Sequence, residues 1–182
     1  MIKNKTDLKN YITEDCLRYG IDIRKLSLKQ YLKFFLDGNP YLKYQICLRK
    51  AEYVCNRKKI LKYFYIKRLN RLKLKTGIDL GINVAGLGLH IPHGKVVVSS
   101  NASIGHNCQI FSDVTIGVDG KGNKKAAIIG DGVRIGSGAR IIGDVTIADN
   151  VCIGANAVVV NDVLESGATV AGIPAKVIAS KG

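Results

Sequence analysis

Tryptophan is absent from this chain of 182 residues, which also has only three histidines, three prolines and one methionine. Three histidines leave few candidates for a general base that is neutral near pH 7. No uninterrupted apolar stretch approaches the ~20 residues that cross a bilayer. The first residues, MIKNKTD, lead into polar sequence without the apolar core of a signal peptide. We therefore expect a soluble protein of the cytoplasm.

The five cysteines lack the spacing of a metal site or of a disulfide framework. Their number is odd, and no CxxC or CxxH pair occurs. Such pairs are typical of zinc sites, and even numbers of cysteines are typical of small secreted domains. The sequence thus favours reduced thiols, and no metal is expected.

The basic residues are concentrated in the first part of the chain. Residues 1–76 carry 20 Lys and Arg against 6 Asp and Glu, a net charge of 20 − 6 = +14, whereas residues 77–182 carry 8 of each sign. This asymmetry indicates two parts with different roles. We therefore divide the chain into a basic α-helical segment, 1–76, and a second domain, 77–182.

Residues 1–75 have helical spacing. Thr6 is the expected N-cap of a first helix that ends near Tyr19-Gly20, where glycine can adopt a left-handed turn. Ser27 is the expected N-cap of a second helix, which residues 37–40 end. Its apolar stripe is formed by Leu28, Tyr31, Leu32, Phe35 and Leu36. A long basic helical stretch is expected from Tyr41 to about Leu74.

After Gly77 the period becomes six residues, which predicts a solenoid. Aliphatic residues recur at this spacing, first as Ile104, Ile110 and Ile116, and then as Ile129, Ile135, Ile141, Ile147, Ile153 and Val159. Each hexapeptide is expected to form one flat side of a triangular coil with its aliphatic side chain inside. Three sides complete a coil, so residues 18 apart should stack: Ile129 on Ile147, Ile135 on Ile153, and Ile141 on Val159.

The period breaks once, between Ile116 and Ile129. The intervening sequence is rich in glycine and charge and is unsuited to a coil side. It is expected to leave the solenoid as a protruding loop. Long loops on rigid scaffolds often carry function, and a tolerated surface insertion is the alternative.

Several segments together resemble the serine-acetyltransferase-like branch of the hexapeptide acyltransferases, whose members O-acetylate serine or the sugars of surface polysaccharides. The resemblance covers roughly residues 77–178. It rests on the following stretches: Gly77-Ile78-Asp79, Gly88-Leu89-His90-Ile91-Pro92-His93, Ile104-Gly105-His106-Asn107-Cys108, Val114-Thr115-Ile116-Gly117, the Ile129–Val159 repeats, and the closing residues 171–178, AGIPAKVI.

The resemblance implies a mainly β fold, a left-handed parallel β-helix preceded by the small helical segment. It also implies a homotrimer with active sites between subunits, and acetyl-CoA as co-substrate without a metal. The transfer in this family is direct, within a ternary complex, so that no serine or cysteine nucleophile is needed.

An imidazole suits the removal of a hydroxyl proton, because its ordinary pKa lies near working pH. His93 matches the general base of the family, and His90 is its rival. Asp79 matches the carboxylate that orients this base, although its gap of 14 residues to His93 is one shorter than the family pattern. A turn residue at the start of a coil is the alternative role for Asp79.

The resemblance also implies which residues approach acetyl-CoA. Ser137 and Ala155 match the small residues that contact its pantetheine arm, and Gly136 and Gly154 flank them. Lys176 is a candidate partner for a phosphate of CoA. The tight corners of the coils are an alternative reason for small residues at 136, 137, 154 and 155.

The expected acceptor is a sugar hydroxyl of a cell-surface polysaccharide or its precursor. The protruding loop lacks the histidine with which serine acetyltransferases hold their amino acid, and the helical segment is shorter than theirs. Lys124 or Lys125 could hold a carboxylate instead, so serine O-acetylation of cysteine biosynthesis is the alternative. A non-catalytic scaffold is a further alternative. A γ-type carbonic anhydrase is disfavoured, because histidines at 90, 93 and 106 do not match its zinc ligands.

The basic segment 1–76 is suited to peripheral contact with the anionic inner face of a membrane. Aromatic residues lie among its charges and could settle at such an interface. A solvated helical face is the plainer interpretation. No nucleic-acid partner is expected, since no recognition motif accompanies the charge.

Overall fold

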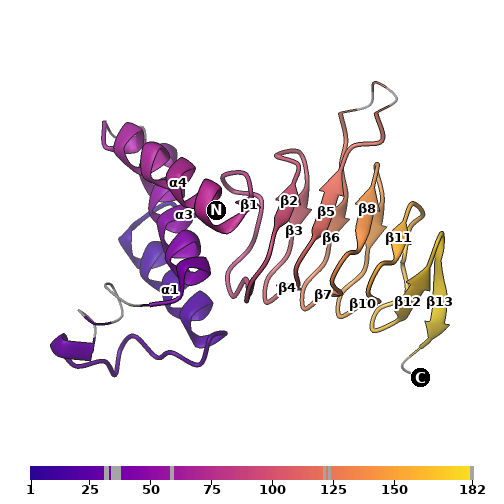
Figure 1. Ribbon diagram of the computed structural model, residues 1–182, viewed down its shortest axis with the longest axis horizontal. Helices are drawn as coiled ribbons and strands as arrows, with labels where there is room; N and C mark the ends of the chain where they lie inside the picture. Colours follow the sequence, from indigo (N-terminus) through magenta and orange to yellow (C-terminus); the bar gives the residue numbers. More distant parts are fainter. Residues whose placement is uncertain (31–32, 34–37, 58–59, 121, 123, 181–182) are drawn as a thin grey trace.

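The computed structural model describes residues 1–30, 33, 38–57, 60–120, 122 and 124–180. Helices occupy the first part of the chain and short strands the second, as the change of period predicts (Figure 1). Among the described residues, no helix combines the length and the apolar character needed to cross a membrane.

The first helix begins two residues earlier than expected. Helix α1 spans Lys5–Leu17, and its N-cap is Asn4 rather than Thr6. The Asn4 side chain accepts from the Asp7 amide at 2.8 Å, while the Asp7 carboxylate accepts from the Asn4 amide at 3.3 Å. This reciprocal pair satisfies two amide groups that have no partner within the helix, which a threonine at position 6 does not do.

The second expected helix lies mostly outside the described residues. Its start is described: Ser27 and Gln30 bond reciprocally, with the Ser27 amide donating to Gln30 Oε1 at 2.9 Å. The stripe positions Tyr31, Leu32, Phe35 and Leu36 are outside the described part of the chain.

The long basic stretch forms two helices rather than one. Helix α3 spans Pro40–Asn56, with Asn39 as its N-cap, and helix α4 spans Lys62–Thr76. Gly77 ends α4 in the left-handed conformation, with φ +73°. A Cβ is disfavoured there, so glycine marks the point where the helices give way to strands.

The second part of the chain is a coil of parallel strands arranged in three sheets. Sheet A runs in the order β1 (Ile78–Asp79), β2 (Val96–Val98), β5 (Val114–Gly117), β8 (Arg140–Ile142) and β11 (Val158–Val159). Sheet B contains β3 (Ser103–Ile104), β6 (Ile128–Ile129) and β9 (Thr146–Ile147). Sheet C contains β4 (Gln109–Ile110), β7 (Arg134–Ile135), β10 (Cys152–Ile153), β12 (Thr169–Gly172) and β13 (Ala175–Ala179).

The strand register confirms the predicted stacking. Ile129 pairs with Ile147, Ile135 with Ile153, and Ile141 with Val159. The nine aliphatic residues of the repeat are at most 3% exposed. The interior of the coil is therefore one continuous apolar core built from side chains that point inward at every sixth position.

The protruding loop is also confirmed. After β5, the described residues 118–120, 122 and 124–127 lie outside the corner between sheets A and B, before β6 begins (Figure 1). The described residues of the loop touch the coil again through Lys125, whose Nζ lies 2.9 Å from Asp144 Oδ2. At the other end of the domain, β13 turns back to run antiparallel to β12.

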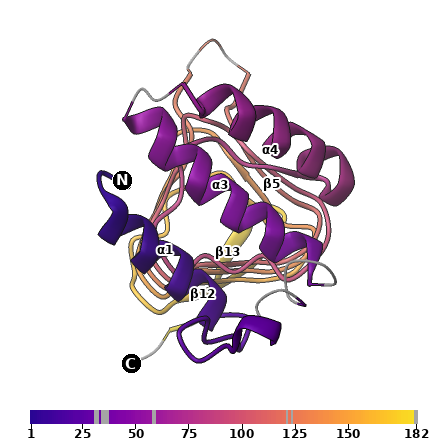
Figure 2. The ribbon, with the colours of Figure 1, turned by 90° about the vertical axis from the view of Figure 1, so that its left-hand side faces the viewer.

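The helices cover the N-terminal end of the coil. Figure 2 shows α3 lying across that end, with α4 beside it. Buried residues of α3 and α4, such as Tyr44, Leu48 and Leu69, belong to the same apolar cluster as Ile78 and Leu89 of the first coil. The helical segment and the coils thus share one core.

Candidate active site

His93 lies at the corner where the chain passes from sheet C to sheet A. We call this corner the His93 edge; it contains residues 92–95 in the first coil, 111–113 in the second, 136–138 in the third and 154–156 in the fourth. His93 is exposed there, and it follows Pro92 directly. An exposed imidazole on a rigid scaffold is accessible to a substrate hydroxyl.

The first coil has one extra residue at this edge. His90 pairs with Gln109 and Val96 with Val114, so Ile91 to Val96 spans 96 − 91 = 5 positions where Ile110 to Val114 spans 114 − 110 = 4. The additional residue makes the corner of His93 wider than the corners stacked on it.

The first coil is one residue shorter than the second at a different corner. Asp79 pairs with Val97, and Ala85 with Ile104, so the first coil passes from sheet A to sheet B in 85 − 79 = 6 positions. The second coil takes 104 − 97 = 7 positions. Relative to the second coil, the first is therefore one residue shorter in the turn at residues 80–84 and one residue longer at the corner that carries His93.

The two small residues expected to contact CoA lie on the same edge as His93. The Ser137 hydroxyl is 3.3 Å from that of Ser112, and the Ser137 carbonyl accepts from the Asn156 amide, next to Ala155. Ser137 and Ala155 are both exposed. His93, Ser137 and Ala155 thus follow one another along one edge, coil by coil.

The flanking glycines have a structural reason of their own. A Cβ on Gly136 would lie 2.6 Å from the Ala155 amide nitrogen, and one on Gly154 would lie 3.0 Å from the Ala171 Cβ. The next coil therefore leaves no room at Gly136 and little at Gly154. Their presence alone carries no information about a ligand.

His90 is half-buried against the end of α1. Its ring meets the Tyr19 ring edge-on, with centroids 4.6 Å apart. Burial, together with the positive charges of Arg18 and His93, lowers the pKa of His90 below its ordinary value. The two histidines are thus close enough to influence each other, and His90 is the less accessible of the two. Sequence reasoning missed Tyr19, because contacts between a helix end and a coil leave no periodic signal.

Asp79 is paired with a lysine rather than with a histidine. Its carboxylate bonds to Lys73 Nζ at the end of α4. Within the described residues it makes no hydrogen bond to His90 or His93. Asp79 is 60% exposed, so the pair with Lys73 lies at the surface.

The remaining predicted residues are not among the corner residues of this edge. Lys176 is exposed on β13, and its backbone pairs with Ala171. His106 is at the corner between sheets B and C, where its Nδ1 lies 3.1 Å from Asp131 Oδ1. The hydrogen bond that the His106 amide donates to Asp131 is the largest cause of the lowered pKa of this carboxyl. No group of three His, Cys, Asp or Glu side chains suited to a metal occurs in the described ranges.

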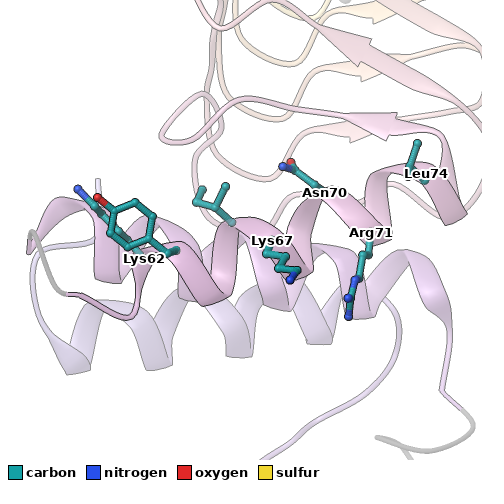
Figure 3. Close-up of a pocket in the computed structure, with 7 residues that line it drawn as sticks. Lys62, Lys67, Asn70, Arg71 and Leu74 are labelled. Carbon is teal, nitrogen blue, oxygen red and sulfur yellow. The ribbon is translucent and has the colours of Figure 1, made fainter.

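A second feature outside this edge is the exposed face of α4. Lys62, Tyr63, Ile66, Lys67, Asn70, Arg71 and Leu74 line a shallow hollow of 570 Å³ (Figure 3). Leu74 is 90% exposed and Tyr63 is 70% exposed. The helix carries six Lys and Arg residues and no Asp or Glu.

Comparisons with known proteins agree with this architecture. Residues 126–161 match the family described as "Bacterial transferase hexapeptide (six repeats)". The chain is 37% identical over 121 residues to a serine acetyltransferase of Helicobacter pylori, covering 64% of this chain and 70% of that protein. It is 34% identical over 139 residues to the serine acetyltransferase of Synechococcus elongatus, covering 75% of this chain and 56% of that protein.

A solved structure extends the likeness to the helices. The crystal structure of Neisseria gonorrhoeae serine acetyltransferase is 30% identical with a TM-score of 0.76, and the match covers 97% of this chain and 68% of that one. The same enzyme in complex with serine is 31% identical with a TM-score of 0.69, covering 96% and 70%. The chain spans between about half and 70% of the length of the curated relatives it matches.

Fold and repeats define the class: this is a hexapeptide-repeat transferase, built as a left-handed parallel β-helix with a small N-terminal helical part. Within that class the chain belongs to the serine acetyltransferase family.

The expectation of a polysaccharide acceptor is wrong. The curated relatives at 34–40% identity and the similar solved structures are serine acetyltransferases. The expectation rested on a missing loop histidine and a short helical segment. Both features lie outside the repeats that match the transferase family, so they were weak guides to the acceptor.

Proposed function

We propose that this chain is a serine O-acetyltransferase that moves the acetyl group of acetyl-CoA to the hydroxyl of L-serine. The observation that carries the proposal is the His93 edge, where an exposed imidazole and two small exposed residues line up in a family whose relatives are named for this activity. The helical segment, too, has a counterpart in the similar solved structures.

The chemistry assigned to His93 is proton removal. As the serine oxygen attacks the thioester carbonyl, neutral imidazole takes the hydroxyl proton, and the C–O bond forms as the C–S bond breaks. The imidazolium then returns the proton to the CoA sulfur that leaves. His93 is the base in this proposal because it is exposed, whereas His90 is half-buried under Tyr19.

Acetyl-CoA is assigned to the same edge. A pantetheine arm that follows the coils past Ser137 and Ala155 would bring the thioester towards His93 in the first coil. Small residues allow the arm to approach the backbone. Lys176 lies on β13, beyond the fourth coil, and is the proposed partner of a CoA phosphate.

The serine carboxylate is assigned to the loop of a second copy. The loop leaves the corner between sheets A and B, whereas His93 lies at the corner between sheets C and A, so one chain holds them on different edges. A homotrimer with its sites between subunits would bring the two edges together. Lys125 is paired with Asp144, which leaves Lys124 as the proposed cation for the carboxylate.

The basic face of α4 supports a further proposal, peripheral contact with an anionic membrane surface. This face carries Lys62, Lys67 and Arg71 and no acidic residue, which complements anionic lipid, and Leu74 and Tyr63 supply exposed apolar area. Sedimentation with phosphatidylglycerol vesicles should fall in Arg71→Glu and should not fall in Lys9→Glu, which changes an exposed cation of α1. Equal binding of both variants would contradict the proposal.

Release of CoA thiol from acetyl-CoA, with and without L-serine, tests the activity. Serine-dependent release should fall by roughly 10²–10⁴-fold in His93→Ala, and His90→Ala should retain more activity than His93→Ala. Lys124→Ala should raise the KM for serine and leave the KM for acetyl-CoA unchanged. A protein that binds neither acetyl-CoA nor serine would instead be a non-catalytic scaffold.

A further inference from the structure

A buried polar cluster joins the helices to the first coil. We call it the helix–coil network; it consists of Asp15, Tyr19, Gln45, Arg49 and Glu52. Asp15, Gln45 and Arg49 are fully buried, and Glu52 is 1% exposed. Buried charges of this kind are uncommon, because removal from water costs free energy that pairing only partly returns.

The charged half of the network binds the backbone of the first coil. Arg49 Nε lies 2.8 Å from Asp15 Oδ2, and Arg49 Nη1 lies 3.1 Å from Glu52 Oε2. The same guanidinium donates to the carbonyls of Ala85, at 2.9 Å, and Gly86, at 2.6 Å.

The two carboxylates continue this contact on either side. Glu52 Oε1 accepts from the Asn83 amide at 2.9 Å, and Asp15 Oδ1 accepts from the Leu89 amide at 3.0 Å. The backbone from residue 83 to residue 89 is therefore bonded to helix side chains at both ends and in the middle.

The neutral half of the network continues to the segment next to His93. Gln45 Nε2 donates to the Leu89 carbonyl at 2.7 Å, and Gln45 Oε1 accepts from the Ile91 amide at 3.3 Å. The Tyr19 hydroxyl lies 2.5 Å from both the Ile91 carbonyl and Gln45 Oε1, and can donate its one proton to either. The polar groups of residues 89 and 91 are thus held by side chains of α1, of α3 and of the turn that follows α1.

Attachment of the helices does not require this network. Tyr44, Leu48 and Leu69 already pack the helices onto the coil through apolar contacts. An apolar cluster of equal volume is often as stable as a buried ion pair. The polar groups add a defined backbone conformation, because their hydrogen bonds fix residues 83–91 in a single arrangement.

We propose that Tyr19 and Gln45 are positioning residues for the base of the proposed serine acetylation, on which this inference rests. They hold the Leu89–Ile91 backbone, and His93 follows two residues later in a corner that is wider by one residue. In the described structure, the His93 side chain itself makes no hydrogen bond, so its position depends on the backbone before it. The helical segment is therefore part of the active site's support.

Two variants remove the bonds and keep the shape. Tyr19→Phe deletes the hydroxyl and keeps the ring against His90, and Gln45→Met deletes both amide contacts at similar volume. Each should lower kcat by about tenfold or more, because a small displacement of His93 from its position beside the substrate hydroxyl slows the reaction. The KM for acetyl-CoA should be unchanged, since Ser137 and Ala155 lie on later coils.

Val54→Ala is the matched control. Val54 is buried on the same helix as Gln45, but it packs with Ile2 and Tyr53 in a separate apolar cluster. It should lower the free energy of unfolding without changing kcat. A general effect of weaker helix docking would lower kcat in all three variants alike, and that result would overturn the proposal.

A second measurement separates this inference from the proposed function. The ring signals of His93 can be followed by NMR without a substrate, because only three histidines are present. If the wild type failed to acetylate serine, the function would be wrong, but Tyr19→Phe and Gln45→Met should still shift the His93 signals while Val54→Ala does not. Unchanged His93 signals in both positioning variants would overturn the inference whatever the activity.

Discussion

At the scale of single residues, His90 shows how the helices change the chemistry of the coil. Its ring is half-buried against Tyr19, and Arg18 and His93 add positive charge nearby. Burial and these charges all oppose protonation, so the pKa of His90 is lowered. Because the unfolded chain then binds the proton more readily, the free energy of unfolding should fall as pH drops below about 6.5.

We predict that His90 titrates below an ordinary imidazole in an NMR experiment. Tyr19→Ala should raise its midpoint towards about 6.5 by admitting water, and Arg18→Gln should also raise it by removing a charge. A His90 midpoint that both variants leave in place would contradict this assignment of cause.

Two glycines of the coil should respond differently to the same added methyl group. Gly136→Ala would place a Cβ 2.6 Å from the Ala155 amide nitrogen, whereas Gly117→Ala would place one 3.7 Å from Ile142 Cδ1. We expect Gly136→Ala to lower the free energy of unfolding by about 1–3 kcal/mol through overpacking, and Gly117→Ala to change it little. Urea unfolding of both variants measures this, and equal effects would contradict it.

At the scale of elements, the strands are mostly two residues long and alternate between core and surface. In β6, Ile129 is 2% exposed and its neighbour Ile128 is 54% exposed. Ile129 also stacks between Ile104 and Ile147, one coil before and one coil after. Such a strand has no stability of its own and depends on the coils on both sides.

Ile129→Ala should therefore cost much more than Ile128→Ala, although the residues are adjacent and identical. We expect a loss of roughly 2–5 kcal/mol for the buried position and within about 0.5 kcal/mol for the exposed one. Thermal and urea unfolding of the pair provide the measurement. Similar losses at both positions would mean that the described register of β6 is incorrect.

The sequence predicted the elements unevenly, for physical reasons. The six-residue period runs from Ile104 to Ile116 and again from Ile129 to Val159, so that stacks such as Ile129 on Ile147 were predictable from spacing alone. Helix ends depend on one or two side-chain bonds, and Asn4 could not be distinguished from Thr6 by pattern. The Tyr19 and Gln45 contacts cross from helix to coil, and no local period records contacts of that kind.

At the scale of the whole molecule, the helical segment and the coils share one core. Tyr44 and Leu48 of α3 belong to the cluster that continues to Ile78 and Leu89. The boundary at residue 77 is a change of element, and we propose that it does not separate two independently folding units. Removal of the helices would expose the apolar end of the first coil and leave the Leu89 amide without Asp15.

We predict one cooperative unfolding transition for the full chain, with helix and tertiary signals coinciding. Residues 77–182 alone should be less stable and should bind an apolar dye. All eight tyrosines lie in residues 1–76, so tyrosine fluorescence during urea unfolding follows the helical segment alone. Far-ultraviolet circular dichroism follows the helices and the strands together. Two separate transitions would instead make residues 1–76 an independent domain.

The helix that lies across the first coil also limits how the protein can grow. An open solenoid end presents unpaired backbone groups to which another chain could add strands, as in a fibre. Here α3 covers the N-terminal end of the coil, and at the C-terminal end β13 pairs with the outer edge of β12. Lengthening of the column by a second molecule is thus disfavoured at the N-terminal end and along sheet C. Self-association through the sides of the coil can instead close into a ring of defined size.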